Sequence, residues 1–457
     1  MGEAPEWLEL QLREALLRDG QGIVQSLLND RSLLPDNVPL KPHEKRYRQR
    51  KIKVITLFGA IDLYRDYICH EKCHQGRAPL DEALGLTGRY SPAVAKLACR
   101  AASQCGSYQE AADGLAEFGS IQLDPRDISR LVQEISPALA PALVSLGPDC
   151  GQSAKPASPE FELVKKKSAQ AKELPPIEVL YVSPDGTGTP MRKDALVGRK
   201  GKQADGGAKT REAKLGCVFT QTSVDEKGKP IRDPDSTSYV GTFGGCRELG
   251  VLLHQEAQRR GLGRAKKVVY LGDGAAWVWE NARLTFPDRI EILDFYHAGE
   301  HISTLCRSVF AQDATLAASK LEKWLHAAKE TSPAGLLKEA SGLLAAHPEW
   351  TEERRSIVKV EIGYLTSHAS RTKYGEYRAA GYFIGSGVIE AGCKTVIGKR
   401  MKQSGMFWGE SGAENLLRLR CLCMGPHFEG TWVARRKIVA DQNRKMFRWS
   451  ESEKMAA

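Results

Sequence analysis

Four short runs of β-branched and apolar residues, separated by helical sequence, constrain the fold more than any other feature. The runs cover residues 177–183, 214–224, 267–273 and 289–296, and a helical pattern at 247–260 lies between the second and the third. Strands that alternate with helices in this way pack as a sheet covered by helices. The sequence therefore predicts an α/β fold for this part of the chain.

The sequence on either side of these runs indicates how the rest of the chain is organised. Residues 147–176 are rich in Pro, Ser and Lys and end in two prolines, which is typical of a linker. Residues 298–380 lack strand signals and carry apolar residues at roughly helical spacings, which indicates a helical insertion. We expect seven segments: an N-terminal helical segment at 1–40, a hairpin and helix-turn-helix region at 41–146, a linker at 147–176, the first part of the core at 177–297, a helical insertion at 298–380, the final part of the core at 381–433 and a tail at 434–457.

The region before the linker combines a basic run with short helices. Residues 41–53 hold seven Lys or Arg residues, and the strand-like sequence around Gly59 predicts a hairpin. The basic run suits a solvated loop and a phosphate-contacting surface about equally. Three short helices expected within 91–136, two of them led by proline, fit a helix-turn-helix module, although many helical bundles share this pattern. The candidate DNA-binding residues of the basic run are Lys45, Arg46, Arg48, Arg50 and Lys51.

Charge and cysteine usage narrow the class of protein. Lys and Arg (66) outnumber Asp and Glu (56), so the net charge is +10, which favours a polyanionic partner. No apolar run reaches the roughly 18 residues of a membrane helix, and the N-terminus lacks the basic and apolar regions of a secretory signal. The 11 cysteines are odd in number and scattered, which indicates reduced thiols in a cytoplasmic protein.

Three acidic residues lie at strand ends or beside the expected sheet. Asp185 and Asp273 follow the first and third strand runs, and Glu390 lies on a late helix. Carboxylates that converge at one edge of a sheet repel one another unless cations neutralise them, and such hard oxygen ligands suit Mg²⁺ or Mn²⁺. Two such ions can hold the attacking and leaving oxygens of a phosphodiester. Taken singly, each residue has a simpler interpretation, because Asp-Gly is a common turn and glutamate is common in helices.

Two other patterns indicate zinc. Residues 297–301 follow the H-x-x-E-H pattern of a class of zinc proteases, but the central glycine weakens the required helix and the pattern leaves the three acidic residues unexplained. Cys69 and Cys73 form a candidate half-site for structural zinc, with His70 or His74 as a third ligand, but no second close pair follows. A structural zinc there stays open and is not predicted.

The late helix also carries cations. Lys394 lies four positions after Glu390, hence on the same face one turn further along, where it would approach a phosphate. Arg400, Lys402 and Trp408 are further candidates for DNA contact, Trp408 through stacking on an unpaired base. The alternative is that Trp408 belongs to the core and the cations are solvated.

Six blocks of sequence, in this order, resemble the DDE transposases of bacterial insertion sequences. The blocks span about residues 177–433, and within these transposases they are similar to the Kra-type group, which is itself similar to the Mutator-like transposases. They are DGTGTPMR, AKTREAKLGCVFTQT, RDPDSTSYVG, VVYLGDGAAWVW, ILDFYHAGEH and FIGSGVIEAGCKTVIGKRMKQSGMFW.

The resemblance implies a ribonuclease-H-like catalytic core with an all-α insertion, preceded by a mainly helical DNA-binding region. It implies that Asp185, Asp273 and Glu390 are the catalytic residues and the ligands of two Mg²⁺ (or Mn²⁺) ions. Asp294 and His297 would form the C/D-x-x-H signature of the Mutator-like group, with an accessory role. Alternatively, Asp294 caps the following helix and His297 is a packed side chain.

The implied reaction is hydrolysis of a phosphodiester at the transposon end, after which the freed 3′-OH attacks target DNA. The implied partners are double-stranded DNA, as terminal inverted repeats and as target, and a second copy of the chain, because pairing two ends requires at least a homodimer. Such an enzyme would act in the bacterial cytoplasm, on the nucleoid. Two alternatives remain: a transposase-derived DNA-binding protein without catalysis, and a zinc-dependent hydrolase using residues 297–301.

Overall fold

The computed structural model describes residues 4–30, 38–146, 176–201, 203 and 206–439. The chain divides into two compact units, of which the first combines Met1–Leu146 with Phe428–Ala457 and the second is Gly147–His427. The expected linker lies outside the described residues except for Pro176, and so does the expected tail beyond residue 439.

The first unit opens with a hairpin. Strands β1 (Glu44–Thr56) and β2 (Gly59–His70) pair antiparallel and meet at Thr56 and Gly59, which confirms the expected hairpin. The basic run lies in β1, so its interpretation as a loop is wrong. Strand β3 (Gly76–Arg77) and helix α2 (Pro79–Leu84) follow. Helix α1 (Ala4–Leu28) packs along β2 near its C-terminal end, whereas most of its other leucines are exposed.

Three helices complete the first unit, together with a helical segment at 428–439. They are α3 (Pro92–Gln104), α4 (Tyr108–Gly119) and α5 (Pro125–Ser145). Ser91 and Asp124 cap α3 and α5 through side-chain acceptors, and each cap is followed by a proline whose missing N–H costs nothing in the first helical turn. These starts confirm the prediction, although α5 continues well beyond residue 136.

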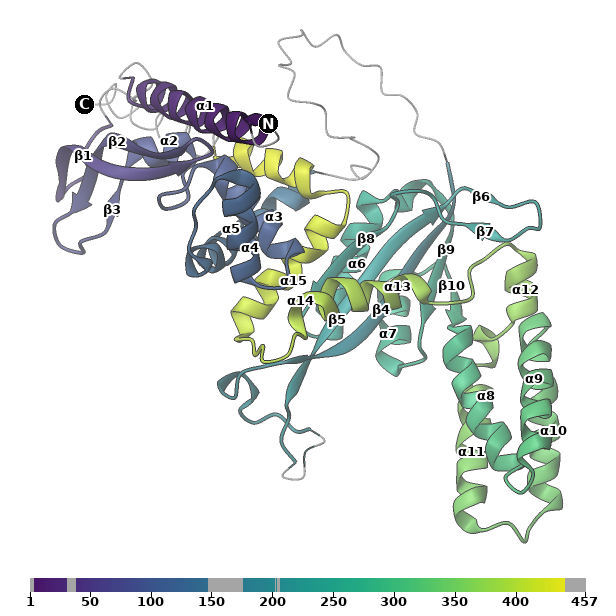
Figure 1. The fold of residues 1–457 in the computed structure, drawn as a ribbon. Helices are drawn as coiled ribbons and strands as arrows, with labels where there is room; N and C mark the ends of the chain where they lie inside the picture. The colour runs from purple at the N-terminus through teal and green to yellow at the C-terminus, as the bar shows by residue number, and fades with distance from the viewer. Residues whose placement is uncertain (1–3, 31–37, 147–175, 202, 204–205, 440–457) are drawn as a thin grey trace, which may run out of the picture. The chain divides into compact units, whose positions relative to one another are not determined.

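The second unit is built on a mixed sheet of five strands (Figure 1). In spatial order they are β10 (Arg289–Leu293), β9 (Ala265–Gly272), β4 (Ile177–Pro190), β5 (Thr210–Gln221) and β8 (Ser238–Thr242). β10, β9 and β4 run parallel, and β5 runs antiparallel to both of its neighbours. The four expected strands are therefore present, and the prediction missed β8. A separate short pair, β6 (Ser223–Val224) and β7 (Pro230–Ile231), follows β5.

Helices cover both faces of this sheet, which confirms the α/β class. Leu215 and Gly216 are neighbours on β5, so they face opposite sides of the sheet. A Cβ at Gly216 would lie 2.5 Å from Leu253 of α6 (Cys246–Arg259), whereas Leu215 lies against Gly392. Gly392 ends α13 (Gly387–Gly392) on the other face. Three further helices belong to this unit: α7 (Ala276–Thr285), α14 (Lys399–Met401) and α15 (Glu410–Met424).

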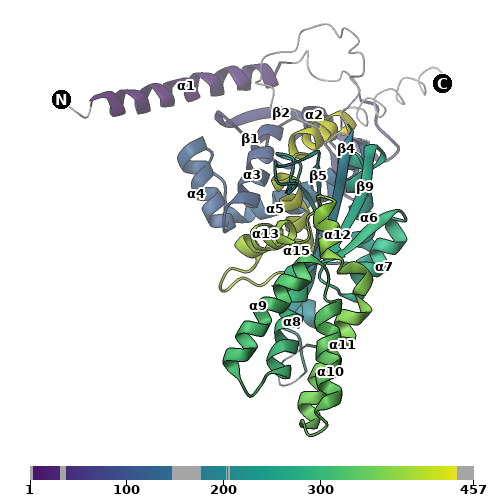
Figure 2. The same ribbon diagram turned by 90° about the vertical axis from the view of Figure 1, so that its right-hand side faces the viewer.

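The expected helical insertion is present between β10 and α13. It consists of α8 (Phe295–Val309), α9 (Ala314–Glu330), α10 (Ala334–Ala346), α11 (Glu352–Ser367) and α12 (Tyr374–Ala379). Figures 1 and 2 show α8 to α11 lying alongside one another and extending away from the sheet. The fourth expected strand ends at Leu293, earlier than predicted, because Asp294 caps α8. Among the described helices, none has both the length and the apolar character needed to cross a bilayer.

Candidate active site

Two parallel strands bring the first two acidic residues to the same edge of the sheet. Val182 of β4 and Tyr270 of β9 are the last residues that these strands pair. Asp185 and Asp273 each lie three positions further along (185 − 182 = 273 − 270 = 3). The carboxyl ends of parallel strands share one edge of a sheet, and ligands of α/β sheets commonly bind at that edge. Both carboxylates therefore lie at the edge where a ligand would bind.

Asp185 lies inside β4, paired with β5, and not in the turn that an Asp-Gly sequence suggests. Its Oδ1 accepts the N–H of Gly186 at 2.6 Å, and its Oδ2 accepts the thiol of Cys393 at 3.2 Å. Burial raises the pKa of Asp185, and the negative charges of Asp273 and Glu390 add to that rise, which outweighs the lowering by the two hydrogen bonds. The charges of Asp273 and Glu390 therefore both act on Asp185.

Asp273, in contrast, lies in a tight turn. Its Oδ1 accepts the N–H of Ala275 at 3.1 Å, and Gly274 has a φ of +93°, in the region that favours glycine. The hydroxyl of Tyr364, on α11, donates to the carbonyl oxygen of Asp273 at 3.1 Å. A Cβ at Gly274 would lie 2.0 Å from that hydroxyl, so the close contact also requires glycine. The helical insertion thus supports the turn that carries the second carboxylate.

Glu390 reaches the same region from α13. The hydroxyl of Ser386, which precedes α13, donates to Oε1 of Glu390 at 3.0 Å. The helix then widens into a π-helical turn at Cys393–Gly398, a geometry that is frequent at functional sites. This turn holds the Cys393 thiol against Asp185, so one continuous helical segment contacts the first carboxylate and carries the third.

A cavity of about 480 Å³ collects these acidic side chains. Carboxylate oxygens are the donors that Mg²⁺ and Mn²⁺ prefer, so the donor set suits the expected ions chemically. Among the described residues, no group of three His, Cys, Asp or Glu side chains is already arranged to hold a single metal ion. The carboxylates therefore share the cavity without forming a coordination shell in this conformation. The residues that line it are Pro184, Asp185, Asp273, Asp294, Tyr296, His297, Glu300, Ser386, Gly387, Ile389 and Glu390.

Asp294 and His297 both line this cavity, and Asp294 has a clear structural role. Asp294 is only 1% exposed and follows directly after β10. Its Oδ1 accepts the backbone N–H of His297 at 2.6 Å, which confirms that it caps α8. Its Oδ2 accepts the backbone N–H of Ser386. Asp294 therefore ties the start of the insertion to the segment that carries Glu390.

The two histidines of the H-x-x-E-H segment have different surroundings. His301 Nδ1 lies 2.6 Å from Oε2 of Glu361, and its ring stacks on Tyr364 with centroids 3.7 Å apart. His297 faces the acidic cavity, and its Nδ1 lies 3.7 Å from Oε2 of Glu300. The imidazole of His301 is thus held within the insertion by a carboxylate and a ring.

The possible zinc half-site of the first unit is a small cluster around His70. Sγ of Cys73 lies 3.3 Å from Nδ1 of His70, and the thiol of Cys69 makes a 3.8 Å contact with the His70 carbonyl oxygen. Since the described residues contain no metal-holding group of three such ligands, the structure adds nothing in favour of zinc there.

The cations after Glu390 are not equally available. Lys394 is exposed, and the ammonium of Lys402, also exposed, donates to the hydroxyl of Thr187 on β4. Arg400 is 1% exposed and lies over the ring of Trp408, 5.1 Å from its centroid. The indole N–H of Trp408 donates to the carbonyl oxygen of Met401 at 3.0 Å. As a correction to the expected DNA contacts, Arg400 is a buried packing residue and Trp408 is partly buried beside it.

The basic residues of β1 also separate into two groups. Lys45, Arg48 and Arg50 are exposed on the strand. Lys51 Nζ lies 2.8 Å from Oδ2 of Asp62, on the neighbouring strand. Arg46 is partly buried, and its guanidinium donates to the carbonyl oxygen of Val38.

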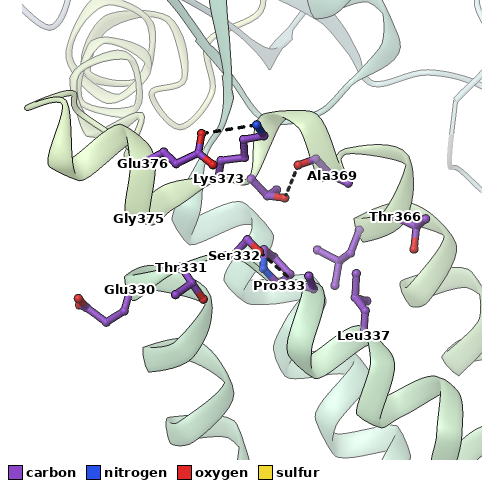
Figure 3. A pocket seen from close by; sticks show the side chains of 13 residues that line it. Glu330, Thr331, Ser332, Pro333, Leu337, Thr366, Ala369, Lys373, Gly375 and Glu376 are labelled. Atoms are coloured by element: carbon purple, nitrogen blue, oxygen red, sulfur yellow. Dashed lines mark hydrogen bonds and ion pairs between the residues drawn. The ribbon is translucent and has the colours of Figure 1, made fainter.

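A second cavity, of about 520 Å³, lies within the helical insertion and includes none of the predicted site residues (Figure 3). Its walls include Leu337 and Leu365. Its two carboxylates are already paired, Glu376 with Lys373 at 3.5 Å and Glu330 with Arg378 at 2.6 Å. It therefore lacks a free acidic pair for metal-dependent chemistry.

Sequence reasoning missed several residues that contact the carboxylates. Ser386 precedes Glu390 by four positions, so helical spacing alone could have identified it. Cys393 and Tyr364 carry no such signal, because they reach Asp185 and Asp273 only through the tertiary fold. Tyr296 adjoins the D-x-x-H residues but belongs to no expected constellation.

No protein-family model matches the sequence, and no significantly similar curated protein was found.

Proposed function

We propose that this protein is a DNA transposase of the DDE type, which cleaves transposon ends and joins the freed 3′-OH to target DNA. The observation that carries the proposal is the shared cavity of Asp185, Asp273 and Glu390, where burial raises the pKa of Asp185 and repulsion from the charges of Asp273 and Glu390 adds to the rise. Such repulsion is costly in a folded protein and is relieved when divalent cations bind.

In this proposal Asp185, Asp273 and Glu390 hold two Mg²⁺ or Mn²⁺ ions. When bound, the ions neutralise charge on the phosphodiester and align the attacking and leaving oxygens. The protein itself orients the ligands: Ser386 fixes one oxygen of Glu390, and the turn at Gly274 fixes Asp273. His297 would take an accessory role at the cavity wall.

The fold supports the same assignment. The five-stranded mixed sheet, covered by helices and interrupted by an all-α insertion between the second and third carboxylates, agrees with a ribonuclease-H-like core. Asp185, three positions beyond the last β4–β9 pair, and Asp273, directly after β9, share one edge of the parallel pairing, which supports the arrangement that the resemblance implies.

The first unit supplies a surface for double-stranded DNA. The ribbon of β1 and β2 exposes Lys45, Arg48 and Arg50, and a two-stranded ribbon fits the major groove. In the second unit Lys394 and Lys402 would contact the DNA backbone near the cut. Pairing two ends calls for a homodimer or a larger assembly, acting on the bacterial nucleoid.

The deciding experiment measures Mg²⁺-dependent cleavage of DNA that carries the inverted repeats flanking the gene. We expect Asp185→Ala, Asp273→Ala and Glu390→Ala each to abolish cleavage. Glu300→Ala is a matched control, because Glu300 is a carboxylate of the same cavity that the proposal does not use. Loss of activity in Glu300→Ala and His301→Ala, with full activity in Asp185→Ala, would favour the zinc hydrolase. Binding of the repeats without any cleavage would favour the non-catalytic DNA-binding protein.

A further inference from the structure

Tyr296 is a large aromatic side chain on the wall of the acidic cavity, and it is 68% exposed. Isolated exposed aromatics are ordinary on protein surfaces. Tyr296 differs from them because it lies among the proposed catalytic carboxylates. Its hydroxyl makes no hydrogen bond with any residue that the structure describes.

The backbone beneath this ring is held firmly. Phe295 is buried, donates its N–H to the carbonyl oxygen of Ile384 at 2.9 Å and packs edge-on against Tyr374 with centroids 5.1 Å apart. On the other side of Tyr296, the cap of α8 fixes His297. An exposed ring on a rigid support loses little conformational entropy when it binds a ligand.

Gly385 lets the ring lie close to the segment that leads into Glu390. A Cβ at Gly385 would come within 3.0 Å of the ring of Tyr296. The residue after Gly385 is Ser386, which bonds Glu390. The ring of Tyr296 therefore lies against the segment that leads into Glu390, with which it shares the cavity, and a larger residue at position 385 would disturb this close approach.

The chemistry of this position selects the ligand. A phenol ring among carboxylates offers no positive charge for a phosphate, but its face can stack on a flat base, and every nucleobase has such a face. We propose that Tyr296 stacks on an unpaired base of the substrate strand next to the phosphodiester that is cut. This inference rests on the proposed function, since it requires DNA in the cavity.

The test compares full-length wild type, Tyr296→Phe, Tyr296→Ala and Leu284→Ala in cleavage of DNA carrying the flanking inverted repeats. The DNA is prepared as a set in which a single abasic site replaces each nucleotide around the cut in turn. Leu284 is the control, because it is an exposed apolar residue of the same unit that does not line the cavity.

Stacking on a base contributes about 1–3 kcal/mol, so Tyr296→Ala should cleave intact DNA roughly 5- to 150-fold more slowly. Tyr296→Phe and Leu284→Ala should cleave at close to the wild-type rate. One abasic position should slow the wild type by a similar factor and leave Tyr296→Ala unaffected, because the two changes remove the same contact.

Three results would overturn the inference. Equal cleavage by Tyr296→Ala and wild type would show that the ring contributes nothing. If the loss caused by Tyr296→Ala and the loss caused by the abasic site multiply at every position tested, Tyr296 does not contact a base. A wild type that binds the DNA but does not cut it would reject both the proposed function and the stacking role, whereas the first two results leave the proposed function intact. Thermal unfolding of each variant checks that Tyr296→Ala is folded.

Discussion

The hydroxyl of Ser386 donates a 3.0 Å hydrogen bond to Oε1 of Glu390, four residues later in the chain. A carboxylate on a short helix would otherwise rotate freely about its side-chain bonds. The bond restricts the rotation of Glu390 and engages one of its two carboxylate oxygens.

We expect Ser386→Ala to lower Mg²⁺-dependent cleavage about 10- to 100-fold, the usual effect of removing a residue that orients a metal ligand. Ser386→Thr keeps the hydroxyl and should retain most activity. Titration of cleavage rate against Mg²⁺ concentration checks the role, because an orienting residue shifts the required Mg²⁺ concentration. Equal Mg²⁺ dependence in Ser386→Ala and wild type would contradict it.

Asp294→Ala should destabilise the protein by at least about 1–2 kcal/mol, since it removes the cap of α8 together with a buried acceptor for Ser386. Asp294→Asn keeps one acceptor oxygen and should lose less. Urea unfolding of the two variants gives both free energies. If Asp294→Ala were as stable as wild type, the cap of α8 would contribute nothing to the free energy of unfolding.

Asp185→Asn should raise the melting temperature of the metal-free protein near neutral pH. Burial raises the pKa of Asp185, and the charges of Asp273 and Glu390 add to the rise, so the ionised carboxylate destabilises the fold increasingly as pH rises above the ordinary carboxyl range. Mg²⁺ should stabilise the wild type by mass action and have little effect on the variant. Thermal scans with and without Mg²⁺ test both parts, and a Mg²⁺-induced shift of equal size in both proteins would rule out Asp185 as a ligand.

Acid should unfold the second unit in part through Glu256. Burial alone would raise the pKa of Glu256, but the hydrogen bond and charge of His427 and the charge of Arg259 lower it overall. A lowered carboxyl pKa contributes stability that is present above about pH 4.5 and is lost as pH falls through the folded-state value. Glu256→Gln should cost about 3–5 kcal/mol at pH 7, as for a broken buried pair, and should flatten the acid limb of stability. Urea unfolding between pH 3 and pH 7 measures both effects.

DNA binding by the β1–β2 ribbon and DNA binding by the helices of the first unit can be distinguished by mutation. Replacing Arg48 and Arg50 of β1 together by alanine should weaken binding and reduce the slope of log affinity against log salt by up to about 0.9 per lost phosphate contact. The matched variant replaces Arg126 and Arg130, which are exposed on α5. A larger loss in the α5 variant would assign binding to the helix-turn-helix interpretation instead of the ribbon.

The elements with strong local signals were predictable. Ser91-Pro92 and Asp124-Pro125 predict the starts of α3 and α5. The capping side chain accepts a backbone N–H of the first turn, and the proline after it has no N–H that needs an acceptor. β8 was missed because its five residues, SYVGT, include a glycine and one aliphatic side chain, whereas β10, of equal length, alternates isoleucines with charged residues. The basic run gave a divided interpretation because β1 alternates between more and less buried residues only at 44–47 and 52–56, and a bulge between Tyr47 and Arg50 interrupts the pattern.

The candidate site was predictable in its carboxylates and not in its surroundings. The predicted strand runs bring out Asp185 and Asp273 in the sequence, and both follow the last parallel pair of β4 and β9, although β4 itself continues beyond Asp185. Arg400 was misjudged because charge suggests a surface, whereas this guanidinium lies over the ring of Trp408 inside the unit. Contacts of this kind depend on how distant segments pack, which spacing along the chain does not encode.

The backbone hydrogen bond between Phe295 and Ile384 joins, at one point, the first residue of the helical insertion to the segment that follows its last helix. A short peptide could therefore bridge that point in place of the whole helical arm without pulling β10 away from α13. Such a shortened chain would lose the hydrogen bond from Tyr364 of α11 to the carbonyl oxygen of Asp273, so the arm acts as a brace for that turn and is more than an appendage.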